Sequence, residues 1–588
     1  MTSRYPGGLI RKNAANTAVT GASGVWDLGS QAQAVKNNTW PISGLALPVS
    51  GSLRFRNSAS AYLNRTPASA GNRQKWTWSA WVKFGTIGAS NGTLFNAGTT
   101  SGEGTRFYLR YTSDILQTGY GSFNYFSTTN VLRDPSAWYH IVCAYDSTQS
   151  TASNRILLYI NGTLATYSFG TNVTLNQNGA VNNNVSHQIG SDQIIPGGYF
   201  DGYMTEVNFI DGQQLTPSSF GQTSPITGVW EPIKYTGTYG TNGFYLSLSD
   251  TSSIGKDFSG NGNNWTPNNI STTNDSTFDL MRDVPTQWAP QSVTDVGGTV
   301  RGNYATLNPL NLPKGGTLSN GNLLWTAPTA EAQAVGTMYV SSGKFYWEMV
   351  LNTAGAGSAF GIANITTDIN NINLTAGSYV YHTNGNKYNG GTGSAYGATF
   401  NNGDIIGVAL DLDAGTLVFY KNNTSQGTAF TSLSGTFTAL IYDGTSASAP
   451  TFTANFGQRP FAYTPPTGFK SLCTTNLPTP TIGATTATAA NKYFDATLYT
   501  GNGGTQTITN AGGFQPDFIW EKARSDAFSH MLYDAVRGVQ KYLRTNVTSA
   551  EVTDATTLTA FNSNGFTVGA GDNGNNSGTT SVAWQWNA

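Results

Sequence analysis

Two segments in the middle of the chain alternate apolar with small or polar side chains, and this alternation constrains the fold more than any other feature. They are Lys344-Phe-Tyr-Trp-Glu-Met-Val350 and the run from Gly403 to Asn423. Every second residue from Ile406 to Leu412 is large and apolar, the period of a strand with one buried face. Turn-forming residues follow at Asp413-Ala-Gly415 and Lys421-Asn-Asn423. The region therefore predicts two β-hairpins in one module.

The same period recurs nearer the N-terminus. In Lys75–Phe84, every second residue from Trp76 to Phe84 is apolar, which places these side chains on one face of a strand. Asn161-Gly162 separates two further apolar runs, Arg155–Ile160 and Thr163–Ser168, and is a strong signal for a tight hairpin. We therefore predict an all-β protein built from several β-sandwiches.

Composition excludes several classes of function. The 588 residues suggest roughly four modules at about one domain per 150 residues. Charged residues make up only 10% of the chain and the net charge is −1, so nothing predicts binding to nucleic acid. We find no basic segment followed by an apolar run at the N-terminus, and no apolar stretch of about 18 residues. We therefore expect no signal peptide and no membrane insertion.

The alternating segments resemble two known families. The runs at 344–350 and 403–423 resemble the core of a SPRY (B30.2-like) domain, and Asn455-Phe-Gly-Gln-Arg-Pro-Phe461 resembles its closing strand. The order of the tryptophan-rich strand, Trp138–Asp146, the Asn161-Gly162 hairpin and Phe200–Phe209 resembles a laminin-G-like (concanavalin A-like) jelly roll. Domains of the SPRY kind bind ligands without catalysing a reaction.

The two ends of the chain resemble structural proteins of tailed bacteriophages, especially phages of marine bacteria. This likeness rests on the opening segment Tyr5–Lys12 and on the final block, which contains Phe514–Lys522, Ser529–Gly538 and Val582–Trp586. We expect strands in the first and last of these three segments and a short helical turn in Ser529–Gly538. The likeness implies a virion protein of the fibre or adhesin kind, made in the host cytoplasm. It also implies other virion proteins as partners and a homo-oligomer, of which a trimer is typical.

We expect five parts in the chain. These are an N-terminal virion-docking arm (1–48), a jelly roll with a linker (49–300), a SPRY-like β-sandwich (301–462), a linker (463–490) and a small C-terminal β module (491–588). The candidate docking residues in the arm are Tyr5, Trp26 and Trp40, isolated apolar anchors in a Gly/Ser/Asn background that cannot bury enough area alone.

We predict no catalytic residue and no catalytic metal. Concanavalin A-like hydrolases that cut β-glucans carry Glu-x-Asp-x-x-Glu on one strand, and the seven glutamates never approach that spacing. The four histidines, His140, His187, His382 and His530, have no partner at metal-ligand spacing. Asp146, Asn154 and Asp201 are candidate ligands for calcium, which prefers oxygen ligands. The alternative is that these side chains cap turns.

Glycan binding requires exposed aromatic rings with amides and hydroxyls around them. Two loop-like stretches have this mixture, Tyr120–Phe126 and Tyr379–Tyr388 with Tyr396. The candidate glycan-binding residues are Tyr120, Tyr125, Tyr381, Tyr388 and Tyr396, although such rings are also common in cores. The leading hypothesis is a non-catalytic tail fibre or fibre-like adhesin that binds host-surface glycans. The alternatives are an architectural capsid or tail decoration protein and, third, a carbohydrate-active enzyme.

Overall fold

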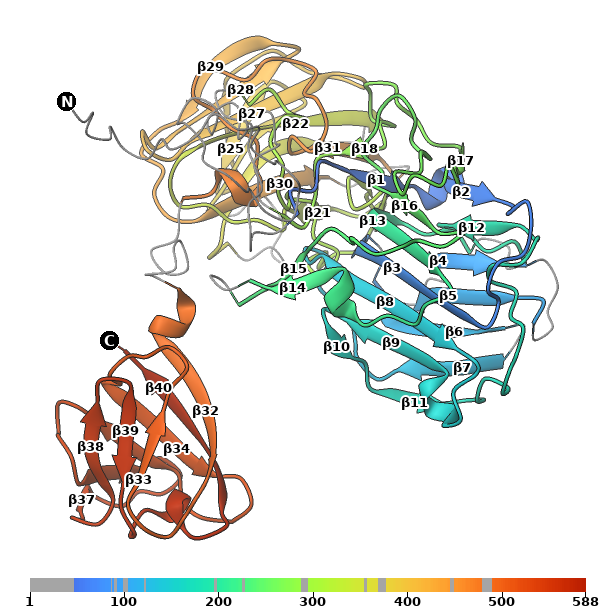
Figure 1. Cartoon of the computed structure of the whole chain (residues 1–588). Coiled ribbons are helices and arrows are strands. Elements are labelled where there is room, and N and C mark those ends of the chain that lie inside the picture. The colour runs from blue at the N-terminus through green and yellow to red at the C-terminus, as the bar shows by residue number, and fades with distance from the viewer. Residues whose placement is uncertain are drawn as a thin grey trace, which may run out of the picture. The chain divides into compact units, whose positions relative to one another are not determined.

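The computed structural model describes residues 47–587 apart from 86, 89–91, 99–103, 121–122, 195–197, 225–227, 287–294, 354–356, 368–376, 445–448 and 479–488. Regular structure in this part is β-strand or short 3-10 turn (Figure 1), which confirms the all-β class. The docking candidates Tyr5, Trp26 and Trp40 lie outside the described residues. Among those described, no helix is long and apolar enough to cross a membrane.

The chain forms two compact units. The larger holds both sandwiches and ends at Pro478, and the smaller holds the C-terminal module. The 3-10 turns are η1 (Asn57–Ala59), η2 (Ala152–Asn154), η3 (Pro217–Ser219), η4 (Thr474–Asn476), η6 (Ala490–Lys492) and η7 (Asn573–Asn575).

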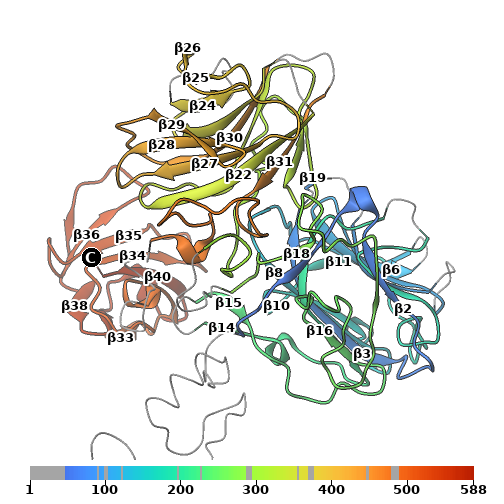
Figure 2. The same cartoon turned by 90° about the horizontal axis from the view of Figure 1, so that it is seen from above.

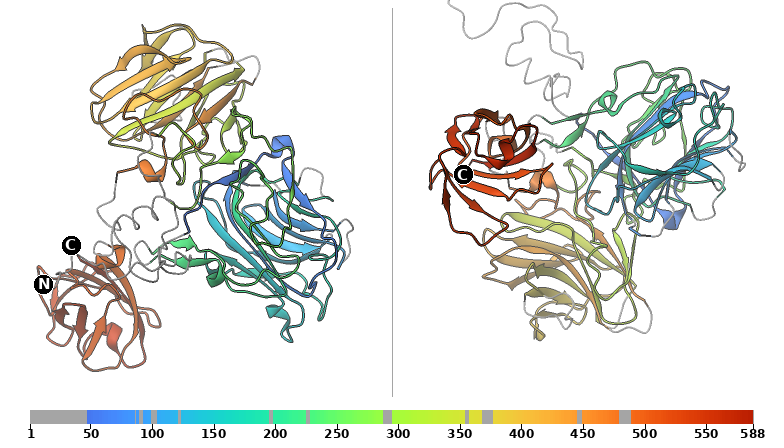
Figure 3. Two further views of the ribbon diagram at one scale, coloured as in Figure 1. Left: turned by 45° about the horizontal axis from the view of Figure 1, so that its top comes forward. Right: turned by 90° about the horizontal axis from the view of Figure 1, so that it is seen from below.

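The first sandwich consists of two antiparallel sheets, seen as two curved layers in Figure 3. One sheet runs β10 (Thr163–Leu164), β9 (Ile156–Ile160), β8 (Tyr139–Asp146), β3 (Lys75–Phe84), β13 (Gly202–Asp211), β1 (Ser52–Phe55) and β18 (Leu280–Met281), with β16 (Phe244–Leu246) also paired to β13. The other runs β11 (Tyr167–Phe169), β7 (Phe123–Thr128), β6 (Ile115–Tyr120), β5 (Phe107–Thr112), β4 (Gly92–Ala97), β12 (His187–Ile189), β2 (Tyr62–Arg65) and β17 (Thr266–Asn268). A separate ribbon pairs β14 (Gly221–Thr223) with β15 (Trp230–Pro232).

The core of this sandwich follows the predicted alternation. Every second residue of β3 from Trp76 to Phe84 is buried in the cluster between the two sheets. The intervening Trp81 is also buried, but it belongs to a second cluster on the opposite face of β3. The predicted hairpin at Asn161-Gly162 is confirmed, because both residues have the positive φ, 48° and 82°, that such a turn requires.

The second sandwich also has two antiparallel sheets. One runs β19 (Thr317–Ser319), β20 (Leu324–Thr326), β31 (Thr451–Asn455), β22 (Lys344–Thr353), β27 (Ile405–Asp411), β28 (Thr416–Lys421) and β29 (Thr424–Phe430). The other runs β21 (Ala332–Val335), β30 (Phe437–Asp443), β23 (Ala359–Asn364), β24 (Ser378–His382), β25 (Asn386–Asn389) and β26 (Thr392–Ala395), whose last three strands form an edge in Figure 2.

The two alternating segments in the middle of the chain are neighbouring strands, since β22 pairs with β27 from Lys344↔Asp411 to Val350↔Ile405. The second predicted turn is confirmed by φ values of 45° at Asn422 and 70° at Asn423. The closing strand was expected to begin at Asn455, but β31 ends there. The reason is that Asn455 and Gln458 turn inward to bond the backbone around Gly457 and Pro460, which ends the extended conformation.

The C-terminal module packs a six-stranded sheet on a three-stranded one (Figures 1 and 3, orange to red). The larger sheet runs β32 (Phe494–Thr500), β40 (Thr580–Trp586), β34 (Phe518–Ala523), β35 (Met531–Asp534), β36 (Lys541–Arg544) and β37 (Val552–Thr553), and the smaller runs β33 (Gln506–Thr509), β39 (Gly565–Val568) and β38 (Leu558–Asn562). The helical turn expected in 529–538 is wrong, because Met531 and Tyr533 alternate into the core as a strand paired with β34.

Candidate binding site

A hairpin at the edge of the SPRY-like sandwich carries three of the five glycan-binding candidates on or next to it. Its strands β25 and β26 pair Tyr388 with Gly393, and every residue of β26 is exposed. A side chain at Gly393 would clash with the Tyr388 ring, so the ring lies against this glycine. The absence of a side chain at 393 therefore gives Tyr388 its place at the edge of the sheet.

Polar groups surround the Tyr388 ring. Asn384 donates a hydrogen bond of 2.9 Å from its side-chain amide to the Tyr388 hydroxyl, and the His382 ring centre lies 5.2 Å from that of Tyr388. Burial lowers the pKa of His382, so this imidazole is neutral at neutral pH. The result is a half-buried ring with an uncharged, hydrogen-bonding neighbourhood, which suits a neutral polar ligand.

Tyr396 joins this hairpin to β29 in the other sheet. Its hydroxyl donates to the Gly427 carbonyl and accepts from the Phe419 backbone N–H at 3.3 Å. Lys387 lies beside it, with its ammonium 5.8 Å from the Tyr396 ring centre and donating to the Ala429 carbonyl. Burial raises the pKa of Tyr396 to about 12, so the phenol remains a neutral donor. These bonds hold the hairpin in place, which leaves Tyr388 as the more available ring.

Two of the five candidates are buried in the sandwich cores. Tyr381 has no exposed surface and packs edge-on against Tyr396, with ring centres 5.3 Å apart. Tyr125 is also buried and packs beneath Tyr120 at 5.4 Å. Neither ring offers a face to a ligand in this structure, because each belongs to a buried core cluster of its sandwich.

The β6–β7 hairpin of the laminin-G-like sandwich presents an aromatic pair, of which only Tyr120 was a predicted candidate. Tyr120 is half-buried, and Phe123, not chosen as a candidate, is 57% exposed with its ring centre 5.5 Å from that of Tyr120. Phe123 accepts through its backbone carbonyl a bond of 3.1 Å from Tyr108, which fixes the strand beneath it. In the sequence, Phe123 directly follows Gly121-Ser122, residue types that favour turns, and this position could have signalled its exposure.

Two buried glutamates of this unit, Glu348 and Glu206, are held by backbone and side-chain donors. Glu348 has a pKa raised by burial, yet it accepts backbone N–H bonds from Ala462 and Tyr463 at 2.8 and 2.9 Å. Glu206 is also buried, which raises its pKa to about 7, and it accepts a bond of 2.7 Å from the Tyr245 hydroxyl. Both carboxyl groups are thus enclosed by protein partners, an arrangement that organises the backbone and the core.

The three calcium candidates do not come together. Asp146 pairs with Lys75 at 2.9 Å and caps Thr148, while Asp201 accepts the backbone N–H groups of Asn320 and Gly321. Asn154 lies in the turn η2 next to Asp146, whose backbone N–H donates to the Arg155 carbonyl, whereas Asp201 binds the turn at Asn320. Within the described part of the chain, no group of three or more His, Cys, Asp or Glu side chains is placed to hold a metal ion.

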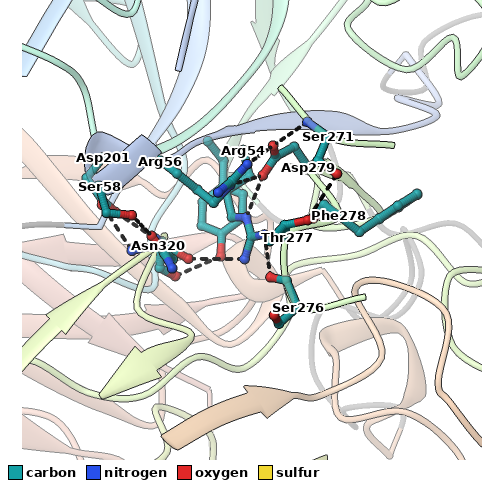
Figure 4. Close-up of polar contacts among 12 residues, drawn as sticks. Arg54, Arg56, Ser58, Asp201, Ser271, Ser276, Thr277, Phe278, Asp279 and Asn320 are labelled. Atoms are coloured by element: carbon teal, nitrogen blue, oxygen red, sulfur yellow. Dashed lines mark hydrogen bonds and ion pairs between the residues drawn. The ribbon is translucent and has the colours of Figure 1, made fainter. Parts of the chain in front are cut away.

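The sandwiches that carry these surfaces meet through a buried polar network (Figure 4). Arg54 and Arg56 both bind the Asp279 carboxylate, at 3.1 and 2.8 Å. Arg54 also donates to the Asn320 carbonyl, and Asp201 binds the backbone of the same turn. These residues lie far apart in sequence, so no local pattern predicted the network.

Apolar contact completes the join. Trp81, Trp138 and Tyr203 of the first sandwich lie in the same buried cluster as the core of the second. The Tyr203 hydroxyl donates a 2.7 Å bond to the Gly321 carbonyl. The two sandwiches therefore hold their loops on one continuous, densely packed body.

Three domain families match parts of the chain. Residues 57–219 match the concanavalin A-like lectin/glucanases superfamily, residues 344–459 match the SPRY domain, and residues 489–588 match a domain of unknown function, DUF7483. The laminin-G-like and SPRY predictions are therefore confirmed.

Individual proteins match over shorter lengths. Ran-binding protein 9 of Xenopus laevis is 29% identical over 191 residues, 31% of this chain and 32% of that protein. Ran-binding protein 10 of Danio rerio is 32% identical over 140 residues, 23% of each protein. The chain thus spans about a third or less of the length of these curated relatives. The SPRY domain of human HERC1 covers 24% of this chain and 90% of its own, with 19% identity and a TM-score of 0.22.

Proposed function

We propose that this protein is a non-catalytic virion component, a tail fibre or fibre-like adhesin, that binds host-surface glycans through edge loops of its two sandwiches. The observation that carries the proposal is the edge hairpin of the SPRY-like sandwich, where Asn384 and a neutral His382 accompany the half-buried Tyr388 ring. Sugars are neutral and polar with apolar C–H faces, so they suit an aromatic ring bordered by amides.

The laminin-G-like sandwich supplies a second surface at Tyr120 and Phe123. Two weak sites on one body raise the effective concentration at each site once the other is occupied, and several copies of the chain would multiply this effect. Weak binding at each hairpin is therefore compatible with firm attachment of a particle.

A glycan array with the intact chain tests the proposal. We expect binding that is lost in Tyr388→Ala or weakened in Phe123→Ala, with Tyr463→Ala and Phe258→Ala as controls for ring loss elsewhere. If the intact chain binds no glycan but binds purified virions tightly, the architectural alternative is the better one. Loss of polysaccharide viscosity on incubation with the protein would instead indicate an enzyme.

A protein ligand for the SPRY-like sandwich is the second candidate. The observation that favours it is the similarity to Ran-binding proteins 9 and 10, whose names record a protein partner. Titrating candidate host-surface proteins against the intact chain and Tyr388→Ala would distinguish the two ligand classes, because free oligosaccharide competes only in the glycan case.

A further inference from the structure

The outer side of the six-stranded sheet in the C-terminal module is apolar. Side chains of β32 alternate between exposed and half-buried, and the exposed set includes Phe494 and Leu498. Strand pairing places Phe494 and Phe518 beside Trp586, and Trp520 beside Trp584, all on this side. We call the surface that carries these five rings the aromatic face. The opposite side of the same sheet faces the core of the module.

Aliphatic residues extend the aromatic face across five strands. Leu498 on β32, Leu532 on β35 and Leu543 on β36 point to the same side as the rings, by their registers and by the burial of their neighbours. Phe494, Leu498 and Leu543 are exposed large apolar side chains on this face. Their grouping with the rings on one side of one sheet sets the face apart from apolar residues scattered singly over a surface.

Charged groups lie at the ends of the strands and are satisfied locally. Lys522 donates to the Asp526 carbonyl at 2.9 Å, and Asp534 pairs with Arg537 at 2.5 Å. The centre of the face is therefore neutral. A neutral centre is self-compatible, because two copies related by a two-fold axis would not place like charges opposite one another.

The rings are packed against each other in a way that suits a protein partner better than a sugar. Trp586 meets Phe494 at an interplanar angle of 53° and Phe518 at 74°, so the three rings do not form a flat platform. The indole N–H of Trp520 is buried, and its ring packs on Trp584 at 5.2 Å. The residues next to the rings on this side include Ala496, Leu532 and Val582, which offer no side-chain hydrogen bonds to sugar hydroxyls. The polar side chains of Lys522 and Asp534 on the same side are bonded to Asp526 and Arg537.

The size of the aromatic face matches a weak, reversible contact. Its five strands hold 28 residues, which at about 3.3 Å per residue and about 4.8 Å between strands gives about 440 Å² for each copy. Two such faces together bury about 900 Å², the size of a weak or transient protein contact. Sheets also pack face to face readily, with interdigitated side chains.

We propose that the aromatic face is the contact surface between copies of this chain, with the C-terminal module of a second copy packed on it. The inference does not depend on the ligand of the sandwiches or on the virion role. It assigns a location to self-association that the sequence could only suggest in general terms.

Sedimentation velocity of the intact chain over a concentration series tests the proposal. We expect the wild type to self-associate, and Leu498→Asp to raise the dissociation constant at least about tenfold, since it places a carboxylate in a dry contact. Leu310→Asp is the matched control, because Leu310 in the other unit is 61% exposed and Leu498 is 62% exposed. Leu543→Lys on β36 is a second variant of the face.

Circular dichroism and thermal melting establish that each variant is folded. A wild type that remains monomeric throughout the series overturns the proposal, as does equal weakening by Leu310→Asp. Self-association that survives both Leu498→Asp and Leu543→Lys in folded protein places the contact elsewhere and also overturns it. A monomer that binds insoluble polysaccharide through Trp584 would show that a glycan occupies the face.

Discussion

Arg54 and Asp279 form an ion pair of 3.1 Å whose side chains are 1% and 0% exposed, at the join between the two sandwiches. The same carboxylate accepts two bonds from Arg56, so two buried guanidinium groups share one acid. Removing the Asp279 carboxylate therefore leaves the guanidinium groups of Arg54 and Arg56 without their ion-pair partner.

Asp279→Ala is therefore expected to reduce the free energy of unfolding of the larger unit by about 3 to 5 kcal/mol, the usual cost of breaking a buried pair. Urea unfolding followed by tryptophan fluorescence measures this. Asp134→Ala is the control, because Asp134 is exposed and caps only its own turn at Ser136. Its loss should stay under about 1 kcal/mol. Equal effects of the two substitutions would show that the network does not stabilise the join.

Much of the fold follows from the sequence because strand period and turn chemistry are local properties. The β3 stripe, the β27–β28 hairpin and the hairpin at Asn161-Gly162 each depend on residues close together in the chain. The candidate site follows less well. In β24 both Val380 and Tyr381 are buried, one in a small outer cluster and the other in the main core, so alternation could not separate inside from outside.

Long-range partnerships could not be predicted for a related reason. Arg54 finds Asp279 more than two hundred positions away, and Phe494 finds Trp586 only because β32 and β40 pair at the two ends of the module. No spacing in the sequence encodes such contacts. The resemblance to known families gave the sandwiches, but it did not give the residues that join them.

Glu206 should make the larger unit less stable as pH rises. Its pKa is raised by burial to about 7, whereas an unfolded glutamate titrates near 4.3. The stabilisation is therefore complete below about pH 4.3 and is lost as pH rises through about 7, a change of up to about 4 kcal/mol for this enclosed group. Glu206→Gln should remove this part of the pH dependence and raise the unfolding midpoint at pH 8. No gain at pH 8 would contradict the assignment.

His140 should make the larger unit less stable as pH falls. The Trp230 indole donates to its Nδ1 at 2.9 Å, so the proton is on Nε2 and is donated to Ser79 at 2.8 Å. Burial lowers its pKa to about 3, from near 6.5 in the unfolded chain. Stability from this neutral form is present above about pH 6.5 and is lost as pH falls towards 3. His140→Gln should flatten the acid limb of a stability profile, and an unchanged limb would argue against it.

The carboxyl groups of Glu521 and Asp572 lie together in the core of the C-terminal module, and we expect them to share one proton. Tyr533 donates to Asp572 at 2.6 Å and the Gly574 N–H donates at 2.9 Å, whereas Glu521 receives a bond from Tyr499. Asp572 has the better donors, so the proton belongs on Glu521, whose pKa is raised well above its usual value by burial and by the neighbouring carboxylate.

The stabilisation from a protonated Glu521 is complete below about pH 4.3, the usual glutamate pKa, and falls as pH rises above it. Glu521→Gln keeps a neutral donor in the same place, so it should raise the melting temperature of the module at neutral and alkaline pH. Glu521→Ala should lower it at every pH, because Asp572 loses its partner and a cavity is left. Glu551→Gln, at an exposed side chain, is the control and should leave the melting profile unchanged. A Glu521→Gln variant that melts below the wild type at pH 9 would mean that both carboxyl groups are ionised and held by other means.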